Sequence, residues 1–516
     1  MRHIAVFPVC IICAMLLASC NRSVGSSAEL NMPAELRGIM EASRAVALPP
    51  RHPGFEEIAA GFLTPAVDAE ADSRLAMSIR QRWFQPRPDF PMVYEPCPTC
   101  GRYMLVMDLS RAISREEAAD EVRLLFDIMR YAYAGYQYFG GDAVFLPMRD
   151  ALLERLALPG DPVPLWYYLN ELLAPALHGA IADSHFRVHN VEMGAPRYAM
   201  RMSDEFVLRR SGDGFVAEIG GAAHAVAATA LRDGTPVDAV VPTITRDGEF
   251  AHAFGLFARA DDPGAREIVV SFGGERCSRI VRLSPLAGYA PYSRPTLETR
   301  EEGGIPVVVT RNFSSGEHSG MTRIAFERSG AAMRDEPLAI IDLRGNSGGS
   351  RNHVGSWIDN YARERPNREL TFVDYLLSTS TLSAVRRQPM LGADQWSRLR
   401  WPDGHSAGEF VANENAIIVL ADNEVFSAGE YFLGLLRQID NVLVVGTNTR
   451  GALVSSRTTG TTLPHSGFAL TFGTSLNLRP DLSQFEGVGF LPDLWVPPGE
   501  SLERVLAFVE RYGLNR

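Results

Sequence analysis

A serine at the start of an expected helix is the first residue in this sequence that can act as a nucleophile. Residues 416–420 form a short continuous apolar run, a turn follows, and Ser427 opens a stretch in which Phe432, Leu433 and Leu436 recur at helical spacing. A serine in this position often serves only as the helix N-cap. It also lies beside free backbone N–H groups and the positive helix end, which suit a developing oxyanion. Ser427 therefore has a structural and a nucleophilic interpretation.

A second serine, Ser406, lies in the sequence Gly-His-Ser-Ala-Gly of residues 404–408. This fits the G-x-S-x-G turn of α/β-hydrolases, which needs a buried strand before the serine and a helix after it. Residues 395–403 are charged and end in Pro-Asp, and residues 409–415 are not convincingly helical. Ser406 is therefore the weaker candidate.

Lysine is absent from the 516 residues, because all 50 basic residues are arginines. This excludes Schiff-base chemistry, a P-loop lysine and a serine–lysine dyad. The formal net charge of −11 argues against a nucleic-acid-binding groove. A nucleophilic serine in this chain must therefore take its base from another residue type, and no nucleic-acid partner is expected.

Three motifs together resemble a known family. They are Leu-Ala-Ile-Ile-Asp-Leu-Arg-Gly-Asn-Ser-Gly-Gly at 338–349, the apolar run and turn before Ser427, and Gly-Val-Gly-Phe-Leu-Pro-Asp at 487–493. Their order and spacing resemble the catalytic core of the C-terminal processing, or tail-specific, serine peptidases over about residues 300–500. The resemblance implies an α/β fold with a ClpP/crotonase-like core, a peptide or protein substrate, and no cofactor or metal.

Most bacterial members of that family pair the serine with a lysine, and here the matching segment 446–452 has Ala452 in its place. Either the protein is inactive or another base serves. The segment Ile-Ala-Asp-Ser-His that ends at His185 resembles the part of the tricorn-like branch that carries a histidine base. His178 and His189 are the nearest competitors.

The same branch implies an orienting glutamate and an oxyanion hole. Glu486 occupies the glutamate position shortly before the Gly-x-Gly-x-x-Pro-Asp segment, and Ser184 is expected to complete a relay between Glu486 and His185. In the implied acyl transfer, His185 removes the proton of Ser427. The oxyanion is expected to be bound by backbone N–H groups of the core. They belong to Ala428 and to Gly348 or Gly349, since glycine allows close backbone approach.

Five regions are expected along the chain. They are a lipoprotein signal peptide at 1–19, a Pro-rich and loosely folded lead-in at 20–110, a helical region carrying the base at 111–195, a β-rich, PDZ-like domain at 196–298, and the catalytic core at 299–516. The core alternates apolar strands with helices, which predicts a largely parallel, buried sheet. The helical region must dock onto this core to bring His185 to Ser427, so domain closure is expected to gate activity.

The amino terminus predicts export and lipid anchoring. A short basic start precedes an apolar stretch that is too short to span a bilayer, and Leu-Ala-Ser-Cys ends it at Cys20. This resembles the lipoprotein box, so we expect a lipid anchor at Cys20 in the bacterial cell envelope, facing the periplasm or the exterior. Cys97 and Cys100 form a CxxC pair, which in an exported protein indicates a small-loop disulfide.

Three functions from different classes remain open on the sequence. The first is a lipid-anchored serine peptidase that uses Ser427. The second is a catalytically silent peptide- or ligand-binding protein with the same fold. The third is an esterase that uses Ser406.

Overall fold

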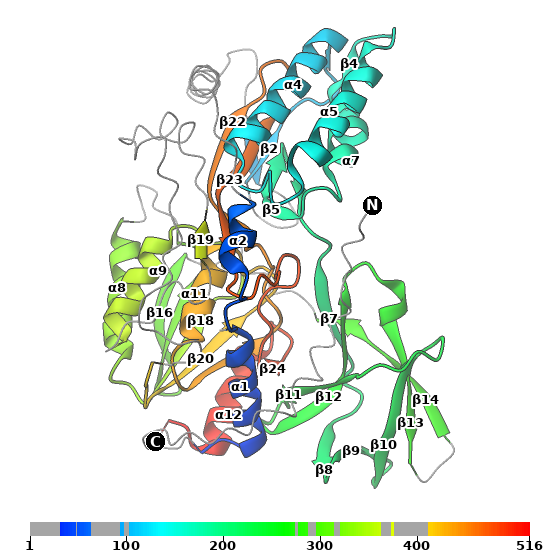
Figure 1. The fold of residues 1–516 in the computed structure, drawn as a ribbon. Helices are drawn as coiled ribbons and strands as arrows, with labels where there is room; N and C mark the ends of the chain where they lie inside the picture. Colours follow the sequence, from blue (N-terminus) through cyan, green and yellow to red (C-terminus); the bar gives the residue numbers. More distant parts are fainter. Residues whose placement is uncertain are drawn as a thin grey trace.

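The computed structural model describes residues 31–47, 49–62, 93–96, 103–273, 277–286, 296–313, 320–362, 373–375 and 411–515. Figure 1 shows a layered α/β core, a helical part above it that long strands connect to the core, and a β-rich part to one side. The predictions on Cys20, Cys97, Cys100 and Ser406 lie outside the described residues.

A six-stranded sheet forms the centre of the core. Its order is β16 (Leu297–Glu302), β17 (Ile305–Thr310), β18 (Leu338–Asp342), β20 (Ala416–Ala421), β21 (Val442–Gly446) and β24 (Leu494–Trp495). Only the edge pair β16–β17 is antiparallel. The predicted parallel, buried sheet is confirmed, because strands covered on both faces are apolar without interruption.

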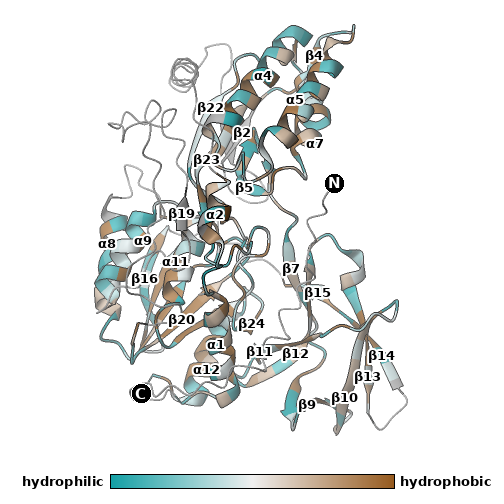
Figure 2. Cartoon of the chain, in the orientation of Figure 1, coloured by the Kyte–Doolittle hydropathy of each residue, from teal (hydrophilic) through white to brown (hydrophobic). Residues whose placement is uncertain are grey.

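Helices cover both faces of this sheet (Figure 1). Side chains alternate along each strand, so Ile341 and Val419 face one layer while Ile340 and Ile418 face the other. The first layer holds α8 (Gly320–Met333), α9 (Arg351–Tyr361) and α11 (Ala428–Leu436), and the second holds α1 (Ala34–Ala47) and α12 (Ser501–Tyr512). Figure 2 shows the sheet strands as the most apolar segments between these layers.

The lead-in is more ordered at its start than the sequence suggests. Leu36 and Met40 of α1 are buried in the same cluster as Phe508 of α12, and Arg44 forms an ion pair with Asp440 at 3.0 Å. The apolar stripe of α1 therefore completes the core. The other described elements of the lead-in are α2 (Phe55–Ala60), β1 (Val93–Pro96) and β2 (Tyr103–Val106).

The helical region begins with α4 (Arg115–Ala132), at the place where a helix is predicted. A capping box fixes its start, because the side chains of Ser114 and Glu117 each accept a backbone N–H from the other residue. The expected helical region also includes residues 165–177, which form one continuous helical run made of α6 (Leu165–Tyr167), the π-helix η2 (Tyr168–Leu173) and α7 (Ala174–Leu177). The short strand β4 (Val163–Pro164) comes directly before this run, and α5 (Gly141–Ala157) and β3 (Ala112–Ile113) lie earlier in the chain.

A second sheet joins the helical region to the core. Its strands are β19 (Val373–Tyr375), β22 (Ser455–Thr462), β23 (Ala469–Leu478), β5 (Asp183–Val188) and β6 (Val191–Met193). β5 pairs with β23 through Val188 and Leu470, and both residues belong to one buried cluster with the helices. Backbone pairing between distant segments thus fixes where β5 lies relative to the core.

The β-rich part is a nine-stranded sheet, and its described strand pairs are all antiparallel. Its strands are β7 (Tyr198–Met202), β8 (Leu208–Ser211), β9 (Gly214–Ile219), β10 (Ala222–Leu231), β11 (Val240–Ile244), β12 (Phe250–Arg259), β13 (Glu267–Phe272), β14 (Cys277–Arg282) and β15 (Ser284–Pro285), with a 3₁₀ turn η3 (Pro263–Arg266). A β-rich domain is confirmed, and the PDZ-like detail stays a prediction.

Candidate active site

Ser427 lies on a strained turn between β20 and α11. Its backbone has φ 53° and ψ −112°, which a residue with a Cβ rarely adopts. The turn is held because Phe426 donates its N–H to the carbonyl of Asn346 at 2.9 Å, and Ser427 donates its own N–H to Glu430 Oε2 at 3.1 Å. The strand–turn–helix thus presents the Ser427 hydroxyl in a fixed direction.

His185 meets this hydroxyl from the other sheet. Its Nε2 lies 3.0 Å from Ser427 Oγ, although the two residues are 242 positions apart in the chain. The imidazole is 5% exposed and lies beside the ring of Phe426, with 4.8 Å between the ring centroids. Because β5 is paired with β23, the site is assembled in this structure without any closing movement.

The imidazole is neutral at physiological pH. Burial, together with the smaller effect of the positive charges on Arg187, Arg351 and Arg450, lowers the pKa of His185 to about 3. A neutral imidazole offers a lone pair at one nitrogen, so His185 is in the state that can accept a proton from Ser427.

Glu486 lies close to His185 but accepts a hydrogen bond from the preceding residue, Ser184. Its Oε1 accepts the backbone N–H of Ser184 at 2.7 Å, and its Oε2 accepts those of Leu453 and Val454 at 2.9 and 3.0 Å. Burial, with the charge of Asp183 as the next cause, raises the pKa of this carboxyl to about 8, although hydrogen bonds from Ser184 and Val454 oppose the rise. No hydrogen bond from Glu486 to the imidazole is present among the described residues.

Asp183 is a carboxylate to which the sequence interpretation assigns no role. It is fully buried, and its Oδ1 lies 3.7 Å from His185 Nδ1. Burial raises its pKa, while hydrogen bonds from His185 N–H and Tyr133 lower it. A spacing of two residues along a strand places side chains on the same face, and this signal could have identified Asp183 from the sequence.

The loop after β18, residues 343–350, which we call the glycine loop, packs against the turn that carries Ser427. Gly348 has φ 81°, and a Cβ there would lie 2.7 Å from the carbonyl oxygen of Phe426 and 3.0 Å from Ser427 Cβ. Its N–H is already donated to Asn346 Oδ1 at 2.9 Å. Among the described residues, the N–H groups of Ala428 and Gly349 donate no hydrogen bond. Of the two glycines considered, Gly349 is therefore the one with an available donor.

The segment expected to carry a lysine lies beside the same turn. Ala452 is buried and donates its N–H to Glu430 Oε2 at 2.9 Å. Glu430 Oε1 accepts the hydroxyl of Thr449 at 2.6 Å and the N–H of Gly451 at 2.7 Å. Glu430 thus ties this segment to the start of α11, and Ala452 offers no basic side chain at the position of the family's lysine.

The remaining candidates lie elsewhere. His178 is the C-cap of α7, and the His189 ring packs 5.4 Å from that of Phe468. Neither contacts Ser427 among the described residues. Over the same residues, no group of His, Cys, Asp and Glu side chains is arranged to hold a metal ion. None of the described helices has the length and apolarity needed to cross a membrane.

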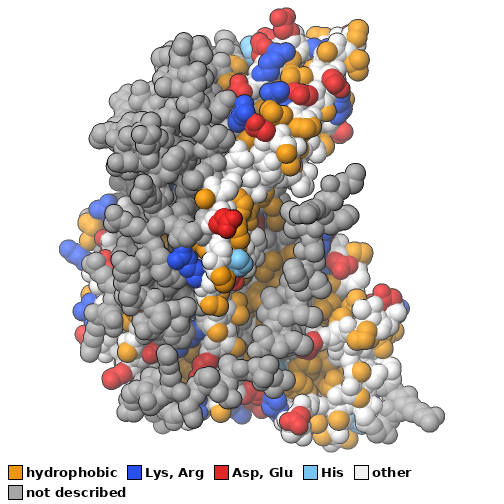
Figure 3. All heavy atoms as spheres, in the orientation of Figure 1, with side chains coloured by type: hydrophobic (Ala, Val, Ile, Leu, Met, Phe, Trp, Pro, Cys, Tyr) orange, Lys and Arg blue, Asp and Glu red, His pale blue; other side chains and the backbone are white. Residues whose placement is uncertain are grey.

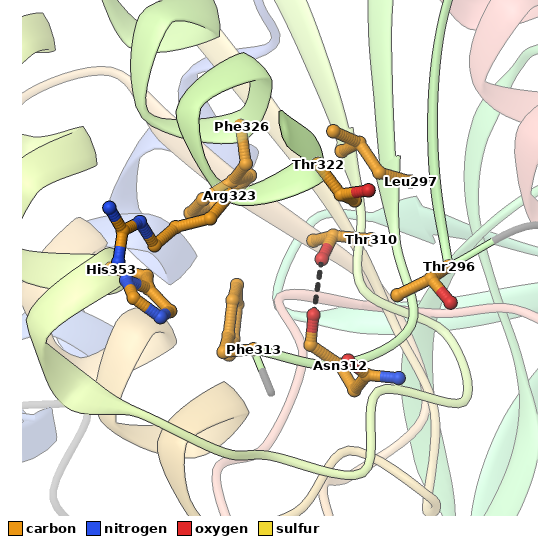
Figure 4. Close-up of a pocket in the computed structure, with 9 residues that line it drawn as sticks. All are labelled: Thr296, Leu297, Thr310, Asn312, Phe313, Thr322, Arg323, Phe326 and His353. Atoms are coloured by element: carbon orange, nitrogen blue, oxygen red, sulfur yellow. Dashed lines mark hydrogen bonds between the residues drawn. The ribbon is translucent and has the colours of Figure 1, made fainter. Parts of the chain in front are cut away.

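A small pocket lies behind the glycine loop (Figure 4). Its lining comes from β16, β17, α8, α9 and the residues that follow β17, and consists of Thr296, Leu297, Thr310, Asn312, Phe313, Thr322, Arg323, Phe326 and His353. Phe313 donates its N–H to the carbonyl of Gly348 at 2.7 Å. The pocket therefore contacts the glycine loop but contains neither Ser427 nor His185.

On the surface, acidic and basic side chains lie interspersed over the upper helices (Figure 3).

Comparison with known proteins identifies a family domain in part of the chain. Residues 328–496, which include the glycine loop, Ser427 and Glu486, match the family model of peptidase family S41. Over these residues the chain matches an S41 peptidase domain. The resemblance drawn from the three motifs is confirmed for this part of the chain, and the match indicates a serine-type peptidase. The chain has no significant match among curated protein sequences.

Solved structures similar to the chain include mature CPAF and two proteases. Mature CPAF complexed with lactacystin is 13% identical, with 78% of this chain and 97% of that chain covered and a TM-score of 0.39. The photosystem II D1 C-terminal processing protease is 16% identical, with 76% and 97% covered and a TM-score of 0.34. The tricorn protease is 15% identical, with 80% and 38% covered and a TM-score of 0.33.

Proposed function

We propose that the chain hydrolyses peptide bonds by acyl-enzyme chemistry, with Ser427 as nucleophile and His185 as general base. The observation that carries this proposal is the 3.0 Å contact between His185 Nε2 and Ser427 Oγ on a strained turn. Nucleophile–base contacts of this length are typical of activated serines. The missing lysine is then replaced by a histidine from a different sheet.

The reaction runs in two steps. The Ser427 oxygen bonds to the peptide carbonyl carbon while its proton passes to His185, and His185 returns that proton to the leaving amine. Water, deprotonated by His185, then releases the acid product and restores the hydroxyl. The N–H groups of Ala428 and Gly349 hold the negative oxygen formed in each step.

Glu486 and Ser184 act in this proposal by fixing the strand that carries the base. Three backbone N–H groups converge on Glu486, one from β5 and two from the segment before β22. Hydrogen bonds to a buried carboxyl resist displacement, because an unpaired donor in the interior costs about 1–3 kcal/mol. Glu486 therefore holds Ser184, and with it the backbone of His185, in register with the core.

Labelling with a fluorophosphonate probe tests the proposal. The Ser427 oxygen is expected to bond to phosphorus as fluoride leaves, and peptide mapping should find the adduct on Ser427. Ser406→Ala is the matched control and should label at the wild-type rate. Labelling on Ser406 would support the esterase instead, and an unlabelled wild type would indicate the silent binding protein.

We also propose that the protein is exported and lipid-anchored at Cys20. The support is the basic start, the short apolar stretch and the Leu-Ala-Ser-Cys sequence. In a bacterial host fed a clickable palmitate analogue, the wild type should incorporate lipid and sediment with membranes. Cys20→Ser should lose both properties. Equal lipid incorporation by the two proteins would contradict the anchor site.

A further inference from the structure

Asp183 is the carboxyl side chain placed directly against the base. Its Oδ1 accepts the backbone N–H of His185 at 2.9 Å and lies 3.7 Å from His185 Nδ1. Its Oδ2 accepts the hydroxyl of Tyr133, a fully buried residue at the end of α4, at 2.8 Å. Both carboxylate oxygens are therefore fixed, and one of them faces the nitrogen that does not contact Ser427.

We infer that Asp183, held by Tyr133, is the positioning residue that orients His185 and stabilises its protonated form. This inference rests on the proposed function and refines it. In the resting site, His185 Nδ1 has no hydrogen-bond partner among the described residues. A separation of 3.7 Å is too long for a hydrogen bond, but catalytic contacts of this kind often tighten when charge develops on the imidazole.

The charges around the imidazole make such a partner necessary. Arg187 from β5, Arg351 from α9 and Arg450 from the loop after β21 all oppose a positive charge on His185. When His185 takes the proton of Ser427, it becomes a cation in a buried site that already faces these three charges. Asp183 supplies the opposing negative charge at the shortest distance found among the described residues.

Glu486 fits this role less well than Asp183. Both of its oxygens are occupied by backbone N–H groups, and none of these belongs to His185. Two neighbouring buried carboxyls rarely ionise together, so one of them keeps a proton. Burial raises the pKa of both carboxyls, so the geometry has to separate them. The oxygens of Glu486 accept backbone N–H groups other than that of His185, whereas Asp183 Oδ1 lies 3.7 Å from His185 Nδ1, so Asp183 is the carboxyl placed to oppose a charge on the imidazole.

The isosteric pair Asp183→Asn and Glu486→Gln tests the assignment. The readout is the kinetics of fluorophosphonate labelling of Ser427, separated into probe affinity and the maximal labelling rate, with the melting temperature as a check on folding. Asp183→Asn should lower the maximal rate about 100-fold or more with unchanged probe affinity, since an orienting carboxylate acts on the transition state. Glu486→Gln replaces an oxygen that accepts a backbone N–H with a donor, so it should lower the melting temperature and reduce the maximal rate less than Asp183→Asn does.

Other outcomes are distinguishable. A wild type that does not label at Ser427 overturns the proposed function itself. A wild-type rate for Asp183→Asn, or a loss confined to Glu486→Gln, overturns the role of Asp183 alone. If Asp183→Asn does not melt cooperatively, it is not folded and its labelling rate cannot be interpreted. The variant Tyr133→Phe then tests the role of Asp183. This variant keeps the carboxylate but removes its support, so a maximal rate several-fold lower supports the inference and an unchanged rate overturns it.

Discussion

Ser427→Ala and His185→Ala are each expected to lower peptide hydrolysis by about 10⁴-fold or more, and the double variant should lose no more than either single one. The reason is that the two side chains carry out one event. Without the base the serine hydroxyl is a weak nucleophile, and without the serine the imidazole has no proton to take. Their losses therefore do not add.

Cleavage of a proteome-derived peptide mixture, followed by mass spectrometry, measures these losses whatever sequence the enzyme prefers. His178→Ala is the matched control, because it removes a histidine of the same region that does not contact Ser427. It should cleave at the wild-type rate. If the double variant were slower than the single ones by the product of their factors, Ser427 and His185 would act independently, and the 3.0 Å contact would not be the catalytic one.

The core could be predicted because the burial of each strand and helix is visible in the apolar pattern of its own short segment. The apolar run over 416–420 is observed as the strand Ala416–Ala421, and the expected alternation of apolar strands and helices continues with Val442–Gly446. Both are uninterrupted apolar runs, and a sheet covered on two faces requires this pattern. The expected helix near Ser427 begins at Ala428. It could be predicted because its apolar residues recur at helical spacing.

The arrangement around the base is harder to predict, since it depends on contacts between distant segments. The pairing of Val188 with Leu470 brings His185 to the nucleophile, and nothing in either strand alone specifies that partner. The motif resemblance points to His185 and Glu486 but carries no distances. It therefore misses that Asp183 lies nearer the imidazole, and that Glu486 accepts backbone N–H groups instead.

Gly348→Ala is expected to slow fluorophosphonate labelling about 100-fold, as loss of one oxyanion donor does in other acyl-transfer enzymes. A Cβ at this position would lie 2.7 Å from the carbonyl oxygen of Phe426 and 3.2 Å from the N–H nitrogen of Ala428. Backbone cannot yield cheaply at these distances, so the glycine loop must move away from the turn. That movement would displace Gly349, whose N–H is one of the two proposed oxyanion donors.

The same substitution also forces alanine into a left-handed conformation, so strain must be separated from the clash. Gly303 provides the control, because it has φ 59°, against 81° for Gly348, and no atom lies within 4 Å of its added Cβ. Both variants should lower the free energy of unfolding by about 1–3 kcal/mol through backbone strain. Only Gly348→Ala should also lose labelling. Equal labelling by Gly348→Ala and Gly303→Ala would show that the glycine loop takes no part in oxyanion binding, and Ala428 would then need a different partner.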